Sequence, residues 1–451
     1  MPFDGRKGAP SGAAFTALFA VILLVFYGGF ALLWASSDTH LYDRLMHLWG
    51  VNLVHQDAAY AKQPLPFFDL QGVLSWSECS HRGIDVLASN PCDPQNRVMN
   101  YAPLIGDLPL HWIGTRNTLP AGLVLDTAFL LMLVAVFQPR TLAGLGLAAA
   151  ASLSQSVLFA VERANIDIVV FILLAATCLW GTKSHVARYA QYALAIGGGL
   201  VKFYPFVILL TALRERPRIV AVLAGVSAAV MATFVFGYWP DLLRLPAVLP
   251  PVYYSGDMFG AHILPRLLGQ GFGLPAAGVV GSLALAAILF CWFSLHTARR
   301  LRSSVGEIDF NARKEALLLC GSILVLGCFL AQSNVAYRAS FLLLTLPGLA
   351  ALWHRARGTH LAPILLSAIV LTLVCLWANT LRFHLLELAT RLTENPKPFR
   401  TWPLLTFFLL REAMWWYVVA VQAAIVICFA RQAPLFKTLA GRSRPVLPQT
   451  D

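Results

Sequence analysis

Two carboxylates follow the first long apolar run of the chain. Asp38 lies just beyond the end of that run, and Asp43 is little more than one helical turn further on. A carboxylate beside a cavity at a membrane surface can take a proton from an acceptor hydroxyl, which is general-base catalysis. The alternative is that these aspartates cap a helix or are solvated acids at the membrane interface. Asp38 and Asp43 are therefore the two candidate catalytic residues, and their spacing does not choose between them.

Three cationic side chains are candidate phosphate partners. Arg163 and Arg338 stand in short polar clusters between apolar runs, and Lys202 lies inside the apolar segment 189–213. Guanidinium groups are natural partners of a phosphate, and an ammonium group binds the same ligand as a point charge. The alternative for Arg338 is an interfacial anchor at the end of a membrane span. We expect the three cations to bind phosphate.

Polar and aromatic side chains that could bind a sugar lie beside these cations and in the long polar segment before them. Such residues hydrogen-bond to a sugar and stack on it, although they suit any ordered loop equally well. Asn165 could instead cap the next helix, and Asp167 could complement its dipole. A lone histidine such as His262 is more often structural. The candidate substrate-binding residues are Asp69, Asp93, Asn100, Tyr101, Glu162, Asn165, Asp167, Tyr204, Asn334, Tyr337 and His262.

Two of the eight cysteines, Cys79 and Cys92, share one polar segment, whereas the other six lie in apolar runs. If that segment faces an oxidising compartment, a disulfide between Cys79 and Cys92 is expected. Metal ligation is the lesser alternative, because no second Cys/His pair has suitable spacing. The sequence thus predicts a disulfide and no metal site. The sequence requires no cofactor, and it does not decide whether the protein depends on a divalent metal ion.

The composition identifies the elements that must position these residues. Hydrophobic residues make up 58% of the 451 residues and charged residues only 12%, and the mean hydropathy is +0.67. Soluble proteins average nearer a quarter charged residues, so this is a membrane protein. The net charge of +12 is divided among short basic clusters between apolar runs. This pattern fixes orientation by the positive-inside rule and does not predict a nucleic-acid partner.

Ten apolar segments are long enough to be candidate membrane spans. With the N-terminus in the cytoplasm, nearly every compact basic cluster falls on the cytoplasmic side. We therefore expect an all-α, polytopic bundle in the inner (plasma) membrane, with a cytoplasmic N-terminus at 1–12, a membrane core at 13–353, C-terminal spans at 354–430 and a basic cytoplasmic tail at 431–451. Long extracytoplasmic connections are expected at 36–117, 239–275 and 383–411. The predicted spans are residues 13–35, 118–137, 141–160, 166–181, 217–238, 274–296, 314–333, 339–353, 360–382 and 412–430.

The apolar segment 189–213 does not fit this alternation, because basic clusters flank both of its ends. It contains three consecutive glycines followed by Lys202 and Pro205, which interrupt a helix. A lysine inside the membrane is costly unless it faces protein or water. We therefore predict a re-entrant helical hairpin with Lys202 near its tip. The alternative is a single kinked span with a snorkelling lysine.

Four of these features, taken in order, resemble the membrane glycosyltransferase-C superfamily. They are Asp38, the 162–167 cluster, Lys202 with Tyr204 and Pro205, and the 334–338 cluster. The greatest similarity is to the polyprenyl-phosphate-mannose-dependent, alpha-1,2-mannosyltransferase-like branch, family 87. The resemblance covers roughly residues 13–353.

The resemblance implies a polyprenyl phosphate-linked sugar donor and a single inverting displacement. On that basis Asp38 would be the general base, and Lys202 and Arg338, with Arg163 as a third, would hold the departing lipid phosphate. The sequence has no Gly-rich nucleotide loop and no large cytoplasmic domain, which argues against a nucleotide-sugar donor. The expected partners are the lipid-linked donor, a glycan or glycolipid acceptor and membrane lipids. The alternatives are a transporter or flippase of a lipid-linked or small polar solute, and a non-catalytic partner in envelope assembly.

Overall fold

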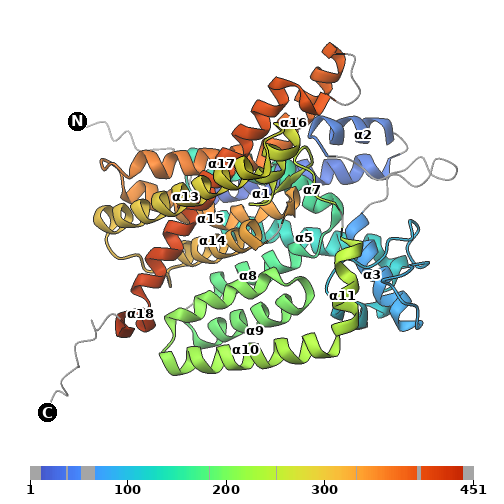
Figure 1. Ribbon diagram of the computed structural model, residues 1–451, viewed down its shortest axis with the longest axis horizontal. Helices are drawn as coiled ribbons and strands as arrows, with labels where there is room; N and C mark the ends of the chain where they lie inside the picture. Colours follow the sequence, from blue (N-terminus) through green and yellow to red (C-terminus); the bar gives the residue numbers. More distant parts are fainter. Residues whose placement is uncertain are drawn as a thin grey trace, which may run out of the picture.

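The protein is described here from a computed structural model, which describes residues 12–36, 39–51, 67–181, 183–249, 251–331, 333–393 and 398–439. These residues form a polytopic helical bundle with one short antiparallel ladder (Figure 1). The ladder pairs β1 (Met258–Phe259) with β2 (Asn334–Val335), and Phe259 lies opposite Asn334.

Within the described ranges, eight helices are long and apolar enough to cross a membrane. A ninth crossing is added if α6 (Leu142–Ser152) and α7 (Gln155–Arg163), which are bent by 51°, count as one span. The eight are α1 (Gly12–Ala35), α5 (Thr118–Phe137, after η2 at Thr115–Asn117), α10 (Pro217–Gly237), α13 (Ala276–Val305), α14 (Arg313–Ala331), α15 (Leu342–Arg355, after η5 at Ala336–Phe341), α16 (Ala362–Thr393) and α17 (Trp402–Gln432).

Shorter helices connect and cover these spans. They are α2 (Thr39–Leu48), α3 (Phe68–His81), α4 (Leu104–Asp107), η1 (Pro109–Trp112), α8 (Asp167–Trp180), α9 (His185–Lys202), η3 (Tyr204–Arg214), α11 (Trp239–Val248), α12 (Ile263–Arg266), η4 (Leu267–Gly271), η6 (Pro398–Arg400) and α18 (Pro434–Leu439).

All ten apolar segments predicted as spans are helical, but two differ from a simple crossing. The segment at 141–160 is bent between α6 and α7. The segment at 166–181 forms only the 14-residue α8, which is about 21 Å long and therefore shorter than the ~30 Å hydrocarbon layer. The connection predicted at 383–411 is helical for most of its length, because α16 continues to Thr393 and α17 begins at Trp402. Leu, Glu, Ala and Arg are strong helix formers, so helices continue where hydropathy falls.

The connections predicted to be cytoplasmic gather at one end of the bundle. The Thr16 hydroxyl donates to the Pro139 carbonyl at 3.0 Å, and Arg313 Nη1 donates to Gln138 Oε1 at 3.0 Å. Figure 1 shows α18 at one end of the bundle and α2, α3 and α11 at the other. The connections predicted to be cytoplasmic and those predicted to be extracytoplasmic therefore lie at opposite ends of the bundle. Which end faces the cytoplasm stays a prediction.

Residues 185–214 form a helical hairpin. α9 and η3 pack against each other, and Phe203, with φ of 58°, turns the chain between them. At the open end of the hairpin, Arg188 Nε lies 2.5 Å from Glu215 Oε1. The basic clusters on both sides of the segment therefore lie at the same end, and Lys202 occupies the tip.

The glycines of α9 allow the two helices of the hairpin, α9 and η3, to pack closely together. A Cβ built on buried Gly199 would lie 2.3 Å from the Phe206 ring, whereas one on exposed Gly197 would meet nothing within 4 Å. We expect Gly199→Leu to lower the free energy of unfolding by about 1–3 kcal/mol, because the extra carbons overpack the contact with η3. The matched change Gly197→Leu should be neutral or slightly stabilising, since it removes a glycine from a helix. Thermal unfolding of the two variants in detergent measures this difference, and equal midpoints would contradict it.

Candidate active site

Asp167 is the centre of a buried cluster of charged groups. Its side chain projects from the first residue of α8, where α7 has just ended at Ala164 in a left-handed conformation with φ of 43°. Its Oδ1 accepts hydrogen bonds from Lys202 Nζ and from the Tyr204 hydroxyl, both at 2.6 Å. Its Oδ2 accepts from Arg338 Nε at 3.0 Å. One carboxylate therefore joins the tip of the hairpin to η5.

Asn165 connects this cluster to the first outer segment. Its Oδ1 accepts from Lys202 Nζ at 2.8 Å and from the Asp167 amide at 3.0 Å. Its Nδ2 donates to Asp69 Oδ2 on α3 at 2.6 Å and to the Tyr101 hydroxyl at 3.3 Å. Lys202 Nζ also lies 4.3 Å from the centre of the Tyr101 ring. Residues far apart in the sequence thus meet at one end of the bundle.

Arg338 is the more accessible cation of the cluster. Its side chain is 13% exposed, compared with 2% for both Lys202 and Asp167. Its Nη1 donates to Asn334 Oδ1 at 2.8 Å, and the β1–β2 ladder fixes the backbone of Asn334. Among the described residues, Nη2 of Arg338 has no hydrogen-bond partner. That NH₂ group of the guanidinium is therefore available to donate a hydrogen bond to an oxygen atom of a ligand.

The cluster contains as many carboxylates as cations. Lys202 and Arg338 contribute two positive charges, and Asp167 and Asp69, the latter joined to the cluster through Asn165, contribute two negative charges. Attraction for an anion therefore comes from the Nη2 donor of Arg338 and not from an excess of positive charge. Burial, followed by the nearby Tyr337 and Asp69, raises the pKa of Tyr101 well above its usual value of 10.0. Tyr101 is therefore a neutral phenol at physiological pH. The cluster can hold a phosphate next to neutral hydroxyl groups.

Arg163 and Glu162 lie beside this cluster and form an ion pair of their own. Arg163 Nε is 2.8 Å from Glu162 Oε2, and the guanidinium carbon lies 5.0 Å from the ring centres of both Phe68 and Phe159. The Phe159 ring in turn contacts Tyr337 at 5.6 Å. Arg163, predicted as a third phosphate-binding residue, therefore pairs with Glu162 beside the cluster.

Several predicted residues lie elsewhere. Asp93 pairs with Arg97 at 2.5 Å, and this pair stabilises the outer segment. The disulfide predicted between Cys79 and Cys92 is present in the same segment. Asn100 is half-buried near Tyr101. These contacts give Asp93 a structural role and keep it out of the Asp167 cluster.

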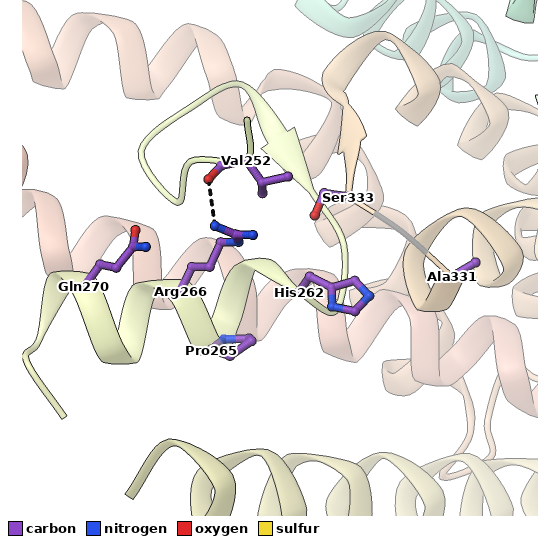
Figure 2. A pocket seen from close by; sticks show the side chains of 7 residues that line it. All are labelled: Val252, His262, Pro265, Arg266, Gln270, Ala331 and Ser333. Carbon is purple, nitrogen blue, oxygen red and sulfur yellow. Dashed lines mark hydrogen bonds between the residues drawn. The ribbon is translucent and has the colours of Figure 1, made fainter. Parts of the chain in front are cut away.

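His262 lies in a separate groove of about 560 Å³ beside α12. Figure 2 shows His262 in the turn just before α12, the helix that carries Arg266, whose guanidinium turns toward Val252. Arg266 Nη1 donates to the Val252 carbonyl at 3.2 Å. His262 is therefore not part of the Asp167 cluster.

Of the two candidate bases, Asp38 lies outside the described residues, and the structure places only Asp43. Asp43 is half-buried on α2. The adjacent Tyr42 lines a cavity with Glu162, which places α2 next to the end of α7.

Within the helices of the described residues, four buried charged side chains were not predicted: Asp126, Arg382, Arg411 and Glu412. Each lies within a predominantly apolar helix, and a charge in such a helix is itself a signal of function. The two arginines hold the loop before β1. Arg411 donates to the carbonyls of Tyr254 and Gly256 at 2.9 and 3.1 Å, and Arg382 donates to that of Ser255 at 3.0 Å.

The comparisons with known proteins find no family model, no curated protein and no solved structure that matches this chain.

Proposed function

We propose that the chain is an integral-membrane hexosyltransferase of the glycosyltransferase-C type. It moves a sugar from a polyprenyl phosphate-linked donor to an extracytoplasmic glycan or glycolipid acceptor, with inversion at the anomeric carbon. The observation that supports this function best is the cluster around Asp167. Two cations of that cluster meet at the end of the bundle where the first outer segment also lies.

The phosphate of the donor is placed at Arg338. The Nη2 amine of Arg338 stabilises the negative charge that develops on the departing phosphate as the sugar–oxygen bond breaks. Lys202, which is buried and bonded to both Asp167 and Asn165, acts mainly as a positioning residue and adds positive charge behind the phosphate. The α9–η3 hairpin is the re-entrant segment that carries Lys202 to this position.

The acceptor hydroxyl attacks the anomeric carbon from the face opposite the phosphate. Its oxygen forms the new glycosidic bond, and its proton passes to the carboxylate of Asp38 or Asp43. The bond between the sugar and the phosphate oxygen breaks with its electron pair on the lipid phosphate. Asp38 is the preferred base, and Asp43 is the alternative.

The choice between the two bases can be tested with a labelled sugar on a short synthetic polyprenyl phosphate. We expect Asp38→Asn to lower the kcat of transfer by about 10²–10⁴-fold, because general-base catalysis contributes that much. Asp43→Asn should retain most of the wild-type rate. The exposed carboxylate of Asp309, which lines a cavity together with Arg214 and Lys437, supplies the control variant Asp309→Asn. Full turnover in Asp38→Asn together with loss of turnover in Asp43→Asn would make Asp43 the base. Full turnover in both variants would exclude both aspartates as the general base.

Buried charges favour one second candidate, a transporter or flippase of a lipid-linked or small polar solute. Such a protein needs charged groups inside several spans, and Asp126, Arg382, Arg411 and Glu412 are buried on α5, α16 and α17. The two functions differ in their dependence on a sealed membrane. Sugar transfer by detergent-solubilised protein supports the transferase, whereas donor movement across liposomes without sugar transfer supports the transporter.

A further inference from the structure

A cavity of about 380 Å³ lies between α1, α2, α5 and α7. This volume is within the range of small-molecule sites. Its walls are mainly apolar and include Phe30 and Trp34 of α1 and Leu158 of α7. Leu24 and Leu123, which also line it, are 71% and 45% exposed on the outer surface of two candidate spans. The cavity is therefore reached from the surface that faces lipid.

Asp126 lines this cavity without a hydrogen-bond partner among the described residues. The residue is only 7% exposed, and its carboxyl group makes no hydrogen bond with any described residue, Oδ1 being fully enclosed. The hydroxyl of Tyr27, another lining residue, donates instead to the Ser152 carbonyl at 2.6 Å. Burying a carboxyl group without a hydrogen bond is costly, and such a group calls for an explanation.

Glu162 adds a second carboxylate to the same cavity. It is 6% exposed, and one of its oxygens lies 2.8 Å from Arg163 Nε, while Oε1 makes no hydrogen bond with a described residue. Among the residues that line the cavity, Asp126 and Glu162 are the two carboxylic acids. Arg163 pairs with Glu162, whereas Asp126 makes no hydrogen bond with a described residue, so the complementary ligand group is a cation with N–H donors.

The apolar walls determine the rest of the ligand. A small hydrated cation would gain little from aromatic and leucine side chains, whereas a hydrocarbon chain would cover them. We propose that this cavity binds a lipid whose head group carries a protonated primary amine. The ammonium group donates to Asp126 and Glu162, and the chain passes Leu24 and Leu123 into the bilayer. This site does not depend on the proposed sugar transfer.

The ligand class can be tested with three probes that share one chain: dodecylamine, dodecyltrimethylammonium and dodecanol. The first has both charge and N–H donors, the second only charge, and the third a hydroxyl without charge. Binding to the full chain in nanodiscs is measured by native mass spectrometry, with empty nanodiscs as the background. We expect dodecylamine to bind at least about tenfold more tightly than either other probe, because charge-assisted hydrogen bonds are the strong ones. Equal binding of dodecylamine and dodecanol would overturn the proposal.

Two kinds of variant place this binding in the cavity. Asp126→Asn keeps the side-chain shape and should abolish the preference for the amine. Gly28→Leu fills the cavity from α1, while Gly29→Leu is its matched control. A Cβ on either glycine meets nothing within 4 Å, but Gly28 lines the cavity and Gly29 does not. Gly28→Leu should weaken binding of all three probes about tenfold or more, and Gly29→Leu should leave it unchanged. An intact amine preference in Asp126→Asn, or equal effects of the two leucines, would refute the site.

Discussion

Replacing Arg338 with glutamine is expected to lower the kcat of sugar transfer by about 10²-fold. The Nη2 group of Arg338 makes no hydrogen bond with a described residue, and the removal of one preorganised donor from an anion site typically costs 10²–10³ in kcat. The charge on the phosphate grows as the bond to the sugar breaks. The loss should therefore appear in kcat more than in the KM for the donor.

Two further variants separate this effect from a general loss of charge or fold. Arg338→Lys keeps a positive charge but lacks the planar fork that also binds Asp167 and Asn334, so partial activity is expected. Arg299→Gln removes an exposed arginine from α13 and should leave turnover unchanged. Wild-type kcat in Arg338→Gln, with the protein folded, would exclude Arg338 from phosphate stabilisation.

The candidate membrane spans follow closely from the sequence because hydrocarbon thickness and apolar helix length are directly related. The hairpin is also predictable. Basic clusters at both ends of 189–213 favour a hairpin over a single kinked span, and the glycines permit the close approach seen between Gly199 and Phe206. The exact ends of helices are harder to predict. α17 begins at Trp402 and buries Arg411, whereas hydropathy alone places Arg411 in a loop.

Most residues of the candidate site were identified from the sequence, but their partners were not. Asp167 was predicted to bind substrate, with the dipole of the next helix as the alternative partner, yet it accepts hydrogen bonds from Lys202, Tyr204 and Arg338. A polar residue between apolar runs shows that a partner is needed. It does not show which distant residue supplies that partner, because this depends on how the helices pack. Asp126 was missed because one acid hardly changes the mean hydropathy of α5.

Asp167→Asn is expected to be among the most destabilising single changes in the bundle. It removes the negative charge between Lys202 and Arg338 and leaves two buried cations that repel each other. Breaking a buried ion pair by removing one partner costs about 3–5 kcal/mol. We expect the free energy of unfolding to fall by about that amount, measured by thermal or denaturant unfolding in detergent.

A double-mutant cycle identifies repulsion as the cause. Lys202→Met alone leaves Asp167 paired with Arg338, so its cost should be smaller than that of Asp167→Asn. In the double variant Asp167→Asn/Lys202→Met, the repulsion between the two cations is gone. The double variant should therefore lose less free energy of unfolding than the sum of the losses in the two single variants. The difference should be at least about 1 kcal/mol, within the range known for contacting residues. Strictly additive losses would show that the three side chains are not energetically coupled, and the phosphate site proposed around them would lose its electrostatic basis.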